Sequence, residues 1–382
     1  MTDRNAILAA AASGRVAVLG AGVSGVAAAR LARALGGAAL VLDEAPAPAD
    51  PAVPRVLREC GAGYRSGGGP LPAGPFSLCV ASPAFAPEHP WLAACRARGV
   101  PVVSELELGA CRWRGRVLAV TGSKGKSSLV KLCADTLNAA GVAAAPGGNY
   151  GVPLCALALD APRLRWAVVE VSSFQMEQTS LFAPEVAVLL NVQPDHLDRH
   201  GTHGAYRALK ERLFARQPPQ AAAILPAGHE ACHGPVATAA RKQTFGAGPG
   251  ADWRYAAGAV TGPGGWRVGL DGSWFDNPVL GLAAAAACAA LAACGLEAPA
   301  VAAGLRAFAP LPHRMQTVAE RDGVRFIDDS KATSLAATGA ALRMAGRPVR
   351  LIAGGRLKER DLGVIKELLT KHVRKGYLIG EC

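Results

Sequence analysis

The stretch LAVTGSKGKSSL, residues 118–129, decides the fold class of this chain. An apolar run that is typical of a buried strand ends in a loop of Gly and Lys, and this loop opens directly into a helical pattern. The backbone N–H groups of such a loop can bind a polyphosphate at the positive end of the helix. The stretch therefore predicts a mononucleotide site, whose phosphate-binding residues are Gly122, Ser123, Lys124, Gly125, Lys126, Ser127 and Ser128.

Two side chains of this loop have expected roles. Lys126 is placed to reach the outer phosphates, and the Ser127 hydroxyl is placed to ligate the magnesium ion that accompanies them. The standard phosphate loop begins with a Gly where this chain has Val120, so TGxxGKSS is a shortened variant. The alternative is a Gly-rich strand-to-helix turn with an incidental Lys.

Composition narrows the class of protein. The 382 residues suggest two or three domains, and the net charge of +12 indicates anionic partners. Aromatic residues make up only 5% of the chain and the Arg residues are scattered, which argues against nucleic acid and favours substrates rich in phosphate and carboxylate. The ten Cys residues include no CxxC pair, and we find neither a signal peptide nor an apolar run long enough to span a membrane. We expect a cytoplasmic protein.

The N-terminal residues predict a β-α-β unit. Strands at 16–19 and 39–42 flank a helix at 24–35, and the turn between the first strand and the helix reads GAGVSG. With Asp43 after the second strand, this fits the dinucleotide fingerprint, although the motif does not distinguish NAD, FAD and a UDP group. A further buried strand in FSLCVASPAF ends at Ser82, at the rim of the same crevice.

Two more α/β units follow, so we expect an α/β protein of three domains: a Rossmann-like domain over 1–113, a central ATP-binding domain over 114–310 and a C-terminal domain over 311–382. The expected central strands are 117–120, 167–171, 186–190 and 221–225, with an antiparallel excursion within 246–275 and a closing helix over 281–294. In the third unit we expect strands at 316–320, 324–327, 349–353 and 376–379, and helices at 334–344 and 364–373. An α/β domain of about 70 residues with a strand at its very end has an unfinished pattern.

Polar residues follow the central strands, where open α/β sheets bind their ligands. Glu170 ends the strand WAVVEV and can hold magnesium, and NVQPDHLDRHG offers Asp195, His196 and Asp198 in one loop. Lys210 falls on the next predicted helix. Taken alone, the strand-end acid, the loop and the helical Lys are also compatible with solvated surface positions.

The order of these motifs resembles that of the Mur ligases. VTGSKGKSS, GGNYGVPL, VVEVSSFQME, NVQPDHLDRHGT, YRALK, LPHRMQ, IDDSKATS and GGRLKERDL follow one another from about residue 14 onward. EVSSFQ, GAGVSG and DDSKATS are most similar to the members that add glutamate to UDP-N-acetylmuramoyl-L-alanine. The resemblance implies that ATP phosphorylates the substrate carboxylate and that the glutamate amine then attacks the acyl phosphate, with two Mg²⁺ ions, in a monomer that acts on small molecules and uses neither nucleic acid nor membrane.

The resemblance also implies roles for single residues. Lys126, Asn149, His196 and Lys210 match catalytic positions; Ser127, Glu170, His196 and Lys210, carbamylated, match metal ligands. Asn277, Arg314 and Asp329 match nucleotide contacts. The substrate-binding positions would be Gly22, Val23, Ser24, Asp43 and Ser82 for the UDP-sugar, and Lys331, Thr333 and Lys358 for phosphate and glutamate.

The chain departs from the family pattern in two places. The usual HNxxN of the adenine site reads DNPVL, with Asp276 and Leu280 at the first and last positions. The third domain has fewer elements than the family's, which leaves open a catalytically impaired UDP-sugar- and nucleotide-binding protein. A folylpolyglutamate synthase disagrees with the N-terminal GAGVSG unit, and a nicotinamide dehydrogenase leaves TGSKGKSS without a role.

Overall fold

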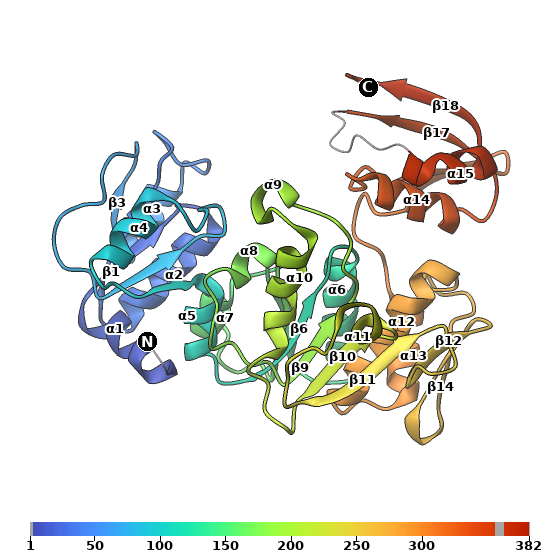
Figure 1. Cartoon of the computed structure of the whole chain (residues 1–382), viewed down its shortest axis with the longest axis horizontal. Coiled ribbons are helices and arrows are strands. Elements are labelled where there is room, and N and C mark those ends of the chain that lie inside the picture. The colour runs from blue at the N-terminus through green and yellow to red at the C-terminus, as the bar shows by residue number, and fades with distance from the viewer. Residues whose placement is uncertain (1–2, 356–362, 382) are drawn as a thin grey trace.

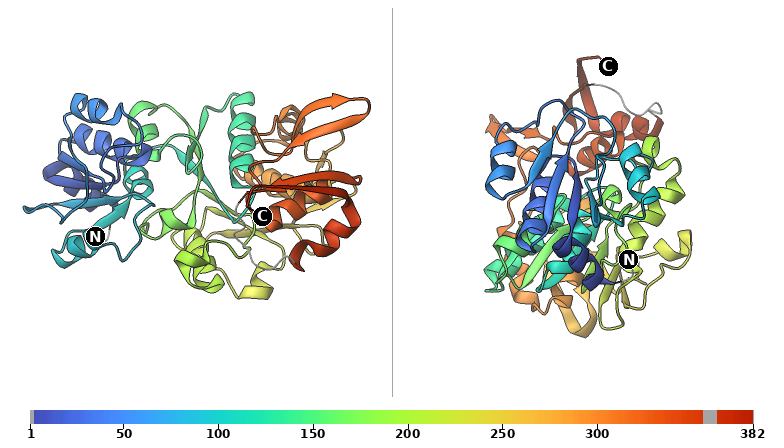
Figure 2. Two further views of the ribbon diagram at one scale, coloured as in Figure 1. Left: turned by 90° about the horizontal axis from the view of Figure 1, so that it is seen from above. Right: turned by 90° about the vertical axis from the view of Figure 1, so that its left-hand side faces the viewer.

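The computed structural model describes residues 3–355 and 363–381, without the side chain of Val364. It has three α/β units that follow one another along the chain (Figure 1). The first and third units lie at opposite ends of the central unit (Figure 2). No helix among the described residues has the length and apolar character needed to cross a membrane.

The first unit is a parallel sheet of five strands in the order β3-β2-β1-β4-β5. Its central strands are buried on both faces, as the unbroken apolar runs of the sequence require. The strands are β1 (Arg15–Leu19), β2 (Ala38–Leu42), β3 (Gly63–Arg65), β4 (Leu78–Ala81) and β5 (Val102–Ser104), and the helices are α1 (Arg4–Ser13), α2 (Val23–Ala34), α3 (Val53–Glu59), α4 (Pro90–Ala97) and α5 (Glu105–Arg112).

The central unit is a sheet of nine strands in the order β14-β13-β12-β11-β10-β9-β6-β8-β7. Strands β7 to β12 pair in parallel around β6, and an antiparallel meander of β12, β13 and β14 ends the sheet. The strands are β6 (Arg116–Thr121), β7 (Ala144–Gly148), β8 (Trp166–Glu170), β9 (Val186–Leu189), β10 (Ala222–Pro226), β11 (Arg241–Gly246), β12 (Trp253–Ala256), β13 (Ala259–Gly262) and β14 (Trp266–Gly269).

Helices cover both faces of this sheet. Leu118 and Val120 pack on one face against α6, α12 and α13, while Val117 and Ala119 pack on the other against α5, α7 and η1. The helices are α6 (Lys126–Ala139), α7 (Leu154–Asp160), α8 (Ser173–Met176), α9 (Leu197–His200), α10 (His203–Glu211), α11 (His229–His233), α12 (Pro278–Ala293) and α13 (Ala298–Ala307), with 3₁₀ turns η1 (Arg212–Phe214) and η2 (Pro263–Gly265).

The third unit has two separate pairs of strands. The hairpin of β15 (Gln316–Arg321) and β16 (Val324–Asp328) is antiparallel, and β17 (Val349–Gly354) pairs in parallel with β18 (Val373–Ile379). Helices α14 (Leu335–Met344) and α15 (Gly363–His372) pack on one another. The other side of the second pair is open: Ile352 and Leu378 are each 70% exposed.

The sequence-based expectations differ from the structure in details of these elements. The helix expected to close the central unit is α12, but α13 follows it. The expected excursion within 246–275 is the meander of Trp253–Gly269, and the strands β7 and β11 were not expected. The last strand begins at Val373 rather than 376, because α15 ends at His372.

Candidate functional site

The predicted phosphate loop joins β6 to α6 at the carboxyl edge of the central sheet. Gly125 caps α6 with φ 86°, a left-handed conformation that disfavours any side chain, so the chain can turn sharply into the helix. No acceptor binds the N–H groups of Gly125, Lys126, Ser127 and Ser128 within the described structure. These donors therefore form a candidate anion site at the helix N-terminus.

Asn191, which sequence reasoning did not assign, holds the first half of this loop. Its Oδ1 accepts from the Ser123 N–H at 3.1 Å and from the Lys124 N–H at 2.9 Å, and its Nδ2 donates to the Lys124 carbonyl at 3.0 Å. The Ser123 and Lys124 N–H groups, expected on phosphate, are thus occupied by Asn191. Asn191 lies two residues after the end of β9, and the strand-end rule that selected Glu170 would also have selected it.

A second contact that the sequence did not reveal fixes Ser123. Its hydroxyl donates to the Gln193 carbonyl at 3.0 Å and accepts from the buried Tyr206 hydroxyl at 3.1 Å. Tyr206 lies on α10, so the loop is connected to the helix that carries Lys210.

Lys126 lies inside its own loop. Its Nζ donates to the Gly122 carbonyl at 2.9 Å and to the Ser123 carbonyl at 3.2 Å. Burial lowers the pKa of the amine, and the nearby Lys124 and Arg314 add to this while Glu170 opposes it. The amine is thus held by two carbonyls of the loop, and Lys126 itself is the first residue of α6.

Glu170 ends β8, next to the loop, and is 2% exposed. Its Oε1 accepts from Asn149 Nδ2 at 2.7 Å, while its buried Oε2 has no hydrogen-bond partner. A buried carboxylate oxygen without a partner is costly unless a cation or a donor satisfies it. The carboxylate thus fits a hard metal ion beside the phosphate loop.

Lys210 on α10 is buried rather than solvated, with 1% of its surface exposed. Its Nζ donates to the Gly122 carbonyl at 2.9 Å and lies 4.4 Å from the centre of the Tyr206 ring. Burial, together with the charge of Lys126, lowers the pKa of this amine to about 7. The loop that follows β9 and the helix after it therefore bring Lys210 to the same carbonyl as Lys126.

His196 precedes α9 as its N-cap, with φ 52°, and packs on Phe174, with ring centres 4.8 Å apart. The neighbouring Asp195 is paired with Lys124 at 3.2 Å, so it is engaged by the phosphate loop. Within the described residues, no group of three or more His, Cys, Asp or Glu side chains lies close enough to hold a metal ion. Asp198 is the second residue of α9, two residues after His196.

The UDP-sugar residues expected in the first unit lie together at the carboxyl ends of β1, β2 and β4. Gly22 caps α2, and the Val23 side chain beside it is 78% exposed. Asp43 accepts from the Ala21 N–H at 2.6 Å, and Ser82 follows β4, with its N–H bound to Leu19. Ser24 lies in the first turn of α2. Asp43 thus helps to fix the conformation of the Gly-rich loop, because it accepts a hydrogen bond from the loop's backbone.

The residues expected in the third unit are only partly assembled. Asp329 accepts from the Met315 N–H at 2.9 Å, and burial raises the pKa of its carboxyl. Lys331 donates its N–H to His313, while Thr333 has no described contact with the central unit and Lys358 lies outside the described residues. The Asn277 side chain caps α12 through Val279 and Leu280, a use that competes with binding adenine.

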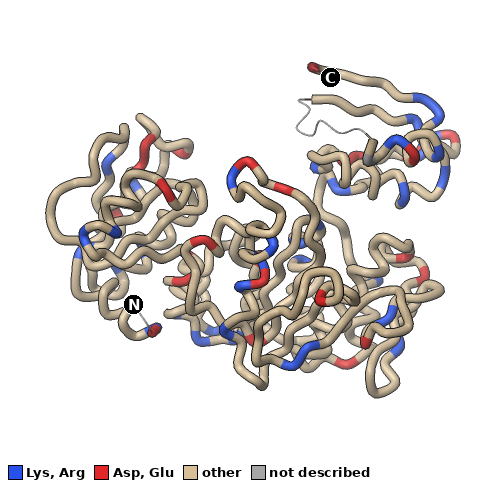
Figure 3. The backbone as a smooth tube through the Cα atoms, viewed as in Figure 1, with Lys and Arg blue, Asp and Glu red and all other residues tan. Residues whose placement is uncertain are grey.

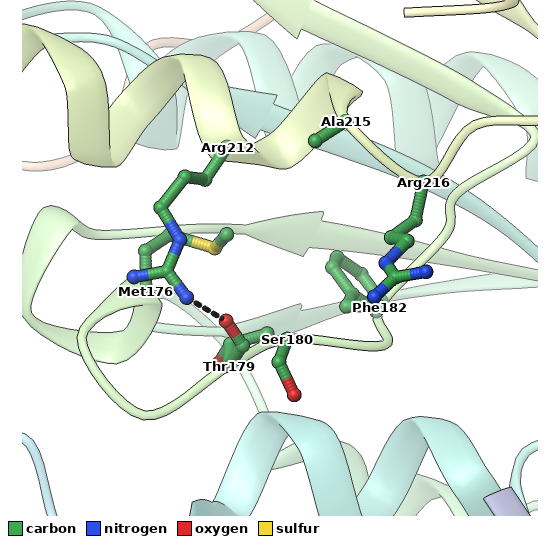
Figure 4. A pocket seen from close by; sticks show the side chains of 7 residues that line it. All are labelled: Met176, Thr179, Ser180, Phe182, Arg212, Ala215 and Arg216. Atoms are coloured by element: carbon green, nitrogen blue, oxygen red, sulfur yellow. Dashed lines mark hydrogen bonds between the residues drawn. The ribbon is translucent and has the colours of Figure 1, made fainter. Parts of the chain in front are cut away.

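Two surface pockets lie away from these residues. Figure 4 shows the first, between α8 and η1, where Arg212 donates to the Thr179 carbonyl at 2.7 Å. The second lies at the amino ends of the central strands, next to Arg116, Trp166 and Trp253. Neither contains a residue of the candidate set, which occupies the opposite, carboxyl edge of the sheet. Lys and Arg residues are distributed over all three units rather than gathered on one face (Figure 3).

The fold and this edge define an α/β protein of three units with a candidate phosphate site, and comparison with known proteins gives its class. Residues 120–266 match the Mur ligase middle domain. The chain is 37% identical over 381 residues to the UDP-N-acetylmuramoylalanine–D-glutamate ligase of Acidobacterium capsulatum, covering 96% of this chain and 82% of that protein. It is 38% identical over 380 residues to the ligase of the same name from Frankia casuarinae, covering 96% and 79%.

Solved structures agree at the level of the fold. The MurF ligase of Thermotoga maritima, in complex with ADP, superposes with a TM-score of 0.59 at 17% identity and covers 90% of this chain and 86% of that one. The MurC ligase of the same organism gives a TM-score of 0.57 at 16% identity, covering 96% and 90%. The chain belongs to the Mur ligase family, among the relatives that are named UDP-N-acetylmuramoylalanine–D-glutamate ligases.

Proposed function

We propose that this chain is an ATP-dependent ligase that joins the D-glutamate amine to the alanine carboxylate of UDP-N-acetylmuramoyl-L-alanine in peptidoglycan synthesis. The observation that carries the proposal is the convergence of Lys126 and Lys210 on one carbonyl, that of Gly122, beside the partnerless carboxylate oxygen of Glu170. Two amines, together with a carboxylate that can bind a cation, are suited to phosphoryl transfer, because they stabilise the negative charge on the oxygens of the transferred group.

The residues of the site divide the work. The free N–H groups of residues 125–128 and the Lys126 amine bind the ATP phosphates and neutralise the charge on the transferred group. Asn149 donates a hydrogen bond to Glu170 and so fixes the orientation of that carboxylate. The substrate carboxylate attacks the γ-phosphorus and ADP leaves. The glutamate nitrogen then attacks the acyl carbon, loses a proton, and phosphate departs.

Magnesium belongs to the same proposal. The hydroxyl of Ser127 and the free Oε2 of Glu170 would hold one ion, and His196 with Lys210 would hold another. When bound, the metal neutralises phosphoryl charge and positions the reacting oxygens. Lys210 can serve as a ligand only after its amine gains CO₂ and becomes a carbamate, and the neutral amine is the form that reacts. The burial that lowers the Lys210 pKa to about 7 supplies that form near neutral pH.

The substrates extend the site over the other two units. Gly22, Val23, Ser24, Asp43 and Ser82 would hold the UDP-sugar in the first unit. Arg314, Asp329, Lys331, Thr333 and Lys358 would contact nucleotide, phosphate and glutamate in the third. We take the chain to act as a monomer in the cytoplasm, where ATP and the UDP-sugar are available; light scattering tests the first of these points.

The deciding experiment follows phosphate release with ATP, UDP-N-acetylmuramoyl-L-alanine and either D- or L-glutamate. We expect release that requires both nucleotide substrates and is faster with D-glutamate, and that stops when EDTA removes magnesium. Hydroxylamine in place of glutamate should trap the acyl phosphate as a hydroxamate. Release that does not depend on the UDP substrate would refute the proposal.

A further inference from the structure

Arg199 of the central unit makes polar contacts both within its own unit and with the first unit, although it is not one of the residues that contact the substrates. Its Nε and Nη2 donate to the two carboxylate oxygens of Glu177 at 3.1 and 2.6 Å. Its Nη2 also donates to the Phe85 carbonyl at 2.8 Å, and its Nη1 to the Ala84 carbonyl at 3.3 Å. All three guanidinium nitrogens are therefore engaged.

Three of these four bonds are partly buried, and the bond to the Ala84 carbonyl is exposed. The Arg199 side chain is 17% exposed and that of Glu177 is 6% exposed. The guanidinium also lies 4.8 Å from the centre of the Phe174 ring, which covers one of its faces. A two-pronged charge-assisted pair in such surroundings fixes direction as well as distance.

The position of Arg199 joins three segments that carry candidate site residues. It lies on α9, three residues after His196. Ala84 and Phe85 follow Ser82 in the loop after β4 of the first unit, and Phe174 and Glu177 lie on and just after α8, which follows Glu170. One side chain thus links the loop of the UDP-sugar crevice to both loops that flank the phosphate-transfer site.

We infer that Arg199 is a positioning residue that sets the spacing between the UDP-sugar crevice and the phosphate-transfer site; this inference rests on the proposed function. The substrate bridges that spacing, with its uridine end in the first unit and its reacting carboxylate beside Lys126. A shift of about 1 Å between reacting groups can cost roughly a hundredfold in rate. The guanidinium therefore acts on catalysis through the loops that it joins.

A second arginine provides the matched control for a simple connection between units. Arg30 on α2 donates through Nη1 and Nη2 to both carboxylate oxygens of Asp160 at 2.9 Å, so it also forms a two-pronged pair between the first and central units. Arg30 is seven residues along α2 from Val23, about 10 Å from the helix end that faces the crevice. Losing this pair weakens the connection without touching the three loops.

The test compares Arg199→Lys with Arg30→Lys. A lysine keeps the charge but cannot reach Glu177 and both carbonyls at once. For Arg199→Lys we expect kcat to fall about 10- to 100-fold, with KM for ATP changed less than about threefold. We also expect amide hydrogen exchange to rise together in residues 83–89 and 195–202. Arg30→Lys should leave kcat and both segments as in the parent.

A second variant guards against a trivial loss of folding. Glu177→Gln keeps the shape and one acceptor, and should raise exchange in the same two segments. Parent values of kcat and of exchange in Arg199→Lys, or a rise confined to residues 195–202, would overturn the inference. If the parent itself shows no glutamate-dependent phosphate release, the proposed function fails, and the exchange comparison still decides whether Arg199 joins the two loops.

Discussion

Lys126 is the residue whose removal should separate catalysis from folding most cleanly. Its amine touches only carbonyls of its own loop, so an alanine there leaves the packing of α6 intact. We expect Lys126→Ala to lower ATP-dependent phosphate release by about 10²- to 10³-fold, because the transferred phosphoryl group loses the nearest cation that stabilises its charge. Lys131→Ala, on the same helix and paired with Asp135, is the control and should stay within about twofold.

The circular dichroism of both variants should equal that of the parent. If Lys126→Ala released phosphate at the parent rate with both substrates present, Lys126 would be a structural member of the loop only.

Lys210 allows a chemical test of its modification. We expect Lys210→Ala to lose at least about a hundredfold of the phosphate-release rate, because the candidate second metal loses a ligand. Acetate or formate, but not chloride at the same ionic strength, should restore part of the rate by supplying the missing carboxylate. An equal response to chloride, or full activity without any addition, would show that the amine is not carbamylated.

At the scale of single residues, part of the candidate site could be predicted from the sequence and part could not, and the difference has a physical reason. Lys126 and Ser127 could be placed because the phosphate loop is local, and Glu170 because it ends an apolar strand. Tyr206 and Arg199 contact segments that are distant in the sequence. Asn191 could have been selected as a strand-end residue, but its contacts with the loop depend on β9 lying beside β6. That neighbourhood belongs to the strand order, which spacing along the chain does not encode.

At the scale of elements, two glycines in the turn from β1 into α2, Gly22 and Gly25, have different surroundings. A Cβ on Gly25 would lie 1.8 Å from the Gly20 carbonyl oxygen, whereas a Cβ on Gly22 would meet nothing within 4 Å. We expect Gly25→Ala to lower the melting temperature by several degrees, since the helix must move away from the strand. Gly22→Ala should have the melting temperature of the parent but should bind the UDP substrate at least tenfold more weakly.

Scanning calorimetry and titration calorimetry check these two outcomes. Equal melting temperatures for both variants would mean that α2 can shift at little cost.

Helix α5 joins the first unit to the central one through buried carboxyl groups. Glu105 accepts from the Cys155 N–H at 2.6 Å, and burial raises the pKa of its carboxyl from 4.5 to about 7. Because the folded pKa is raised, the group favours folding fully below pH 4.5, and that contribution is lost as the pH rises towards 7. The shift corresponds to about 3 kcal/mol at most.

We therefore expect parent stability to fall between pH 5 and pH 8 by more than that of Glu105→Gln, which cannot ionise. Urea midpoints at pH 5, 6.5 and 8 measure the difference. Parallel pH profiles for parent and variant would show that the carboxyl has an ordinary pKa.

Elements with a clear period were the easiest to anticipate. The strands at 16–19, 39–42 and 117–120 and the helix at 24–35 agree with the structure to within about a residue or two. By contrast, β7 reads AAPGG, a composition that disfavours strands, and it forms because it is an edge strand where proline is tolerated. Its existence depends on β8 beside it and not on its own residues.

For the whole molecule, the units differ in how much they bury. Among the described residues of the third unit only Gly339, Leu342 and Ile365 are buried, whereas the first and central units hold continuous cores. We expect limited trypsin digestion to cut first within residues 311–381, since local opening is easiest where few apolar contacts hold the chain. A resistant product near residues 1–310 should still bind ATP and the UDP substrate.

Mass spectrometry of the products and titration calorimetry check this order. Earlier cleavage within the first or central unit would contradict it, as would a resistant product that binds neither ligand. With glutamate added, we expect phosphate release from the whole chain to be slow. The residues that are expected to bind the glutamate substrate lie in the third unit, which buries the fewest side chains.

The crowding of cations around the phosphate loop has a consequence for the resting protein. Burial is the main cause that lowers the pKa of both Lys126 and Lys210, while Glu170 and Asp195 oppose the repulsion from the neighbouring cations. Folding thus removes two amines from water before any phosphate arrives, which disfavours their charged forms. A polyanion that binds beside them favours the charged forms, so the affinity of the empty loop for phosphate is coupled to the protonation of these two amines.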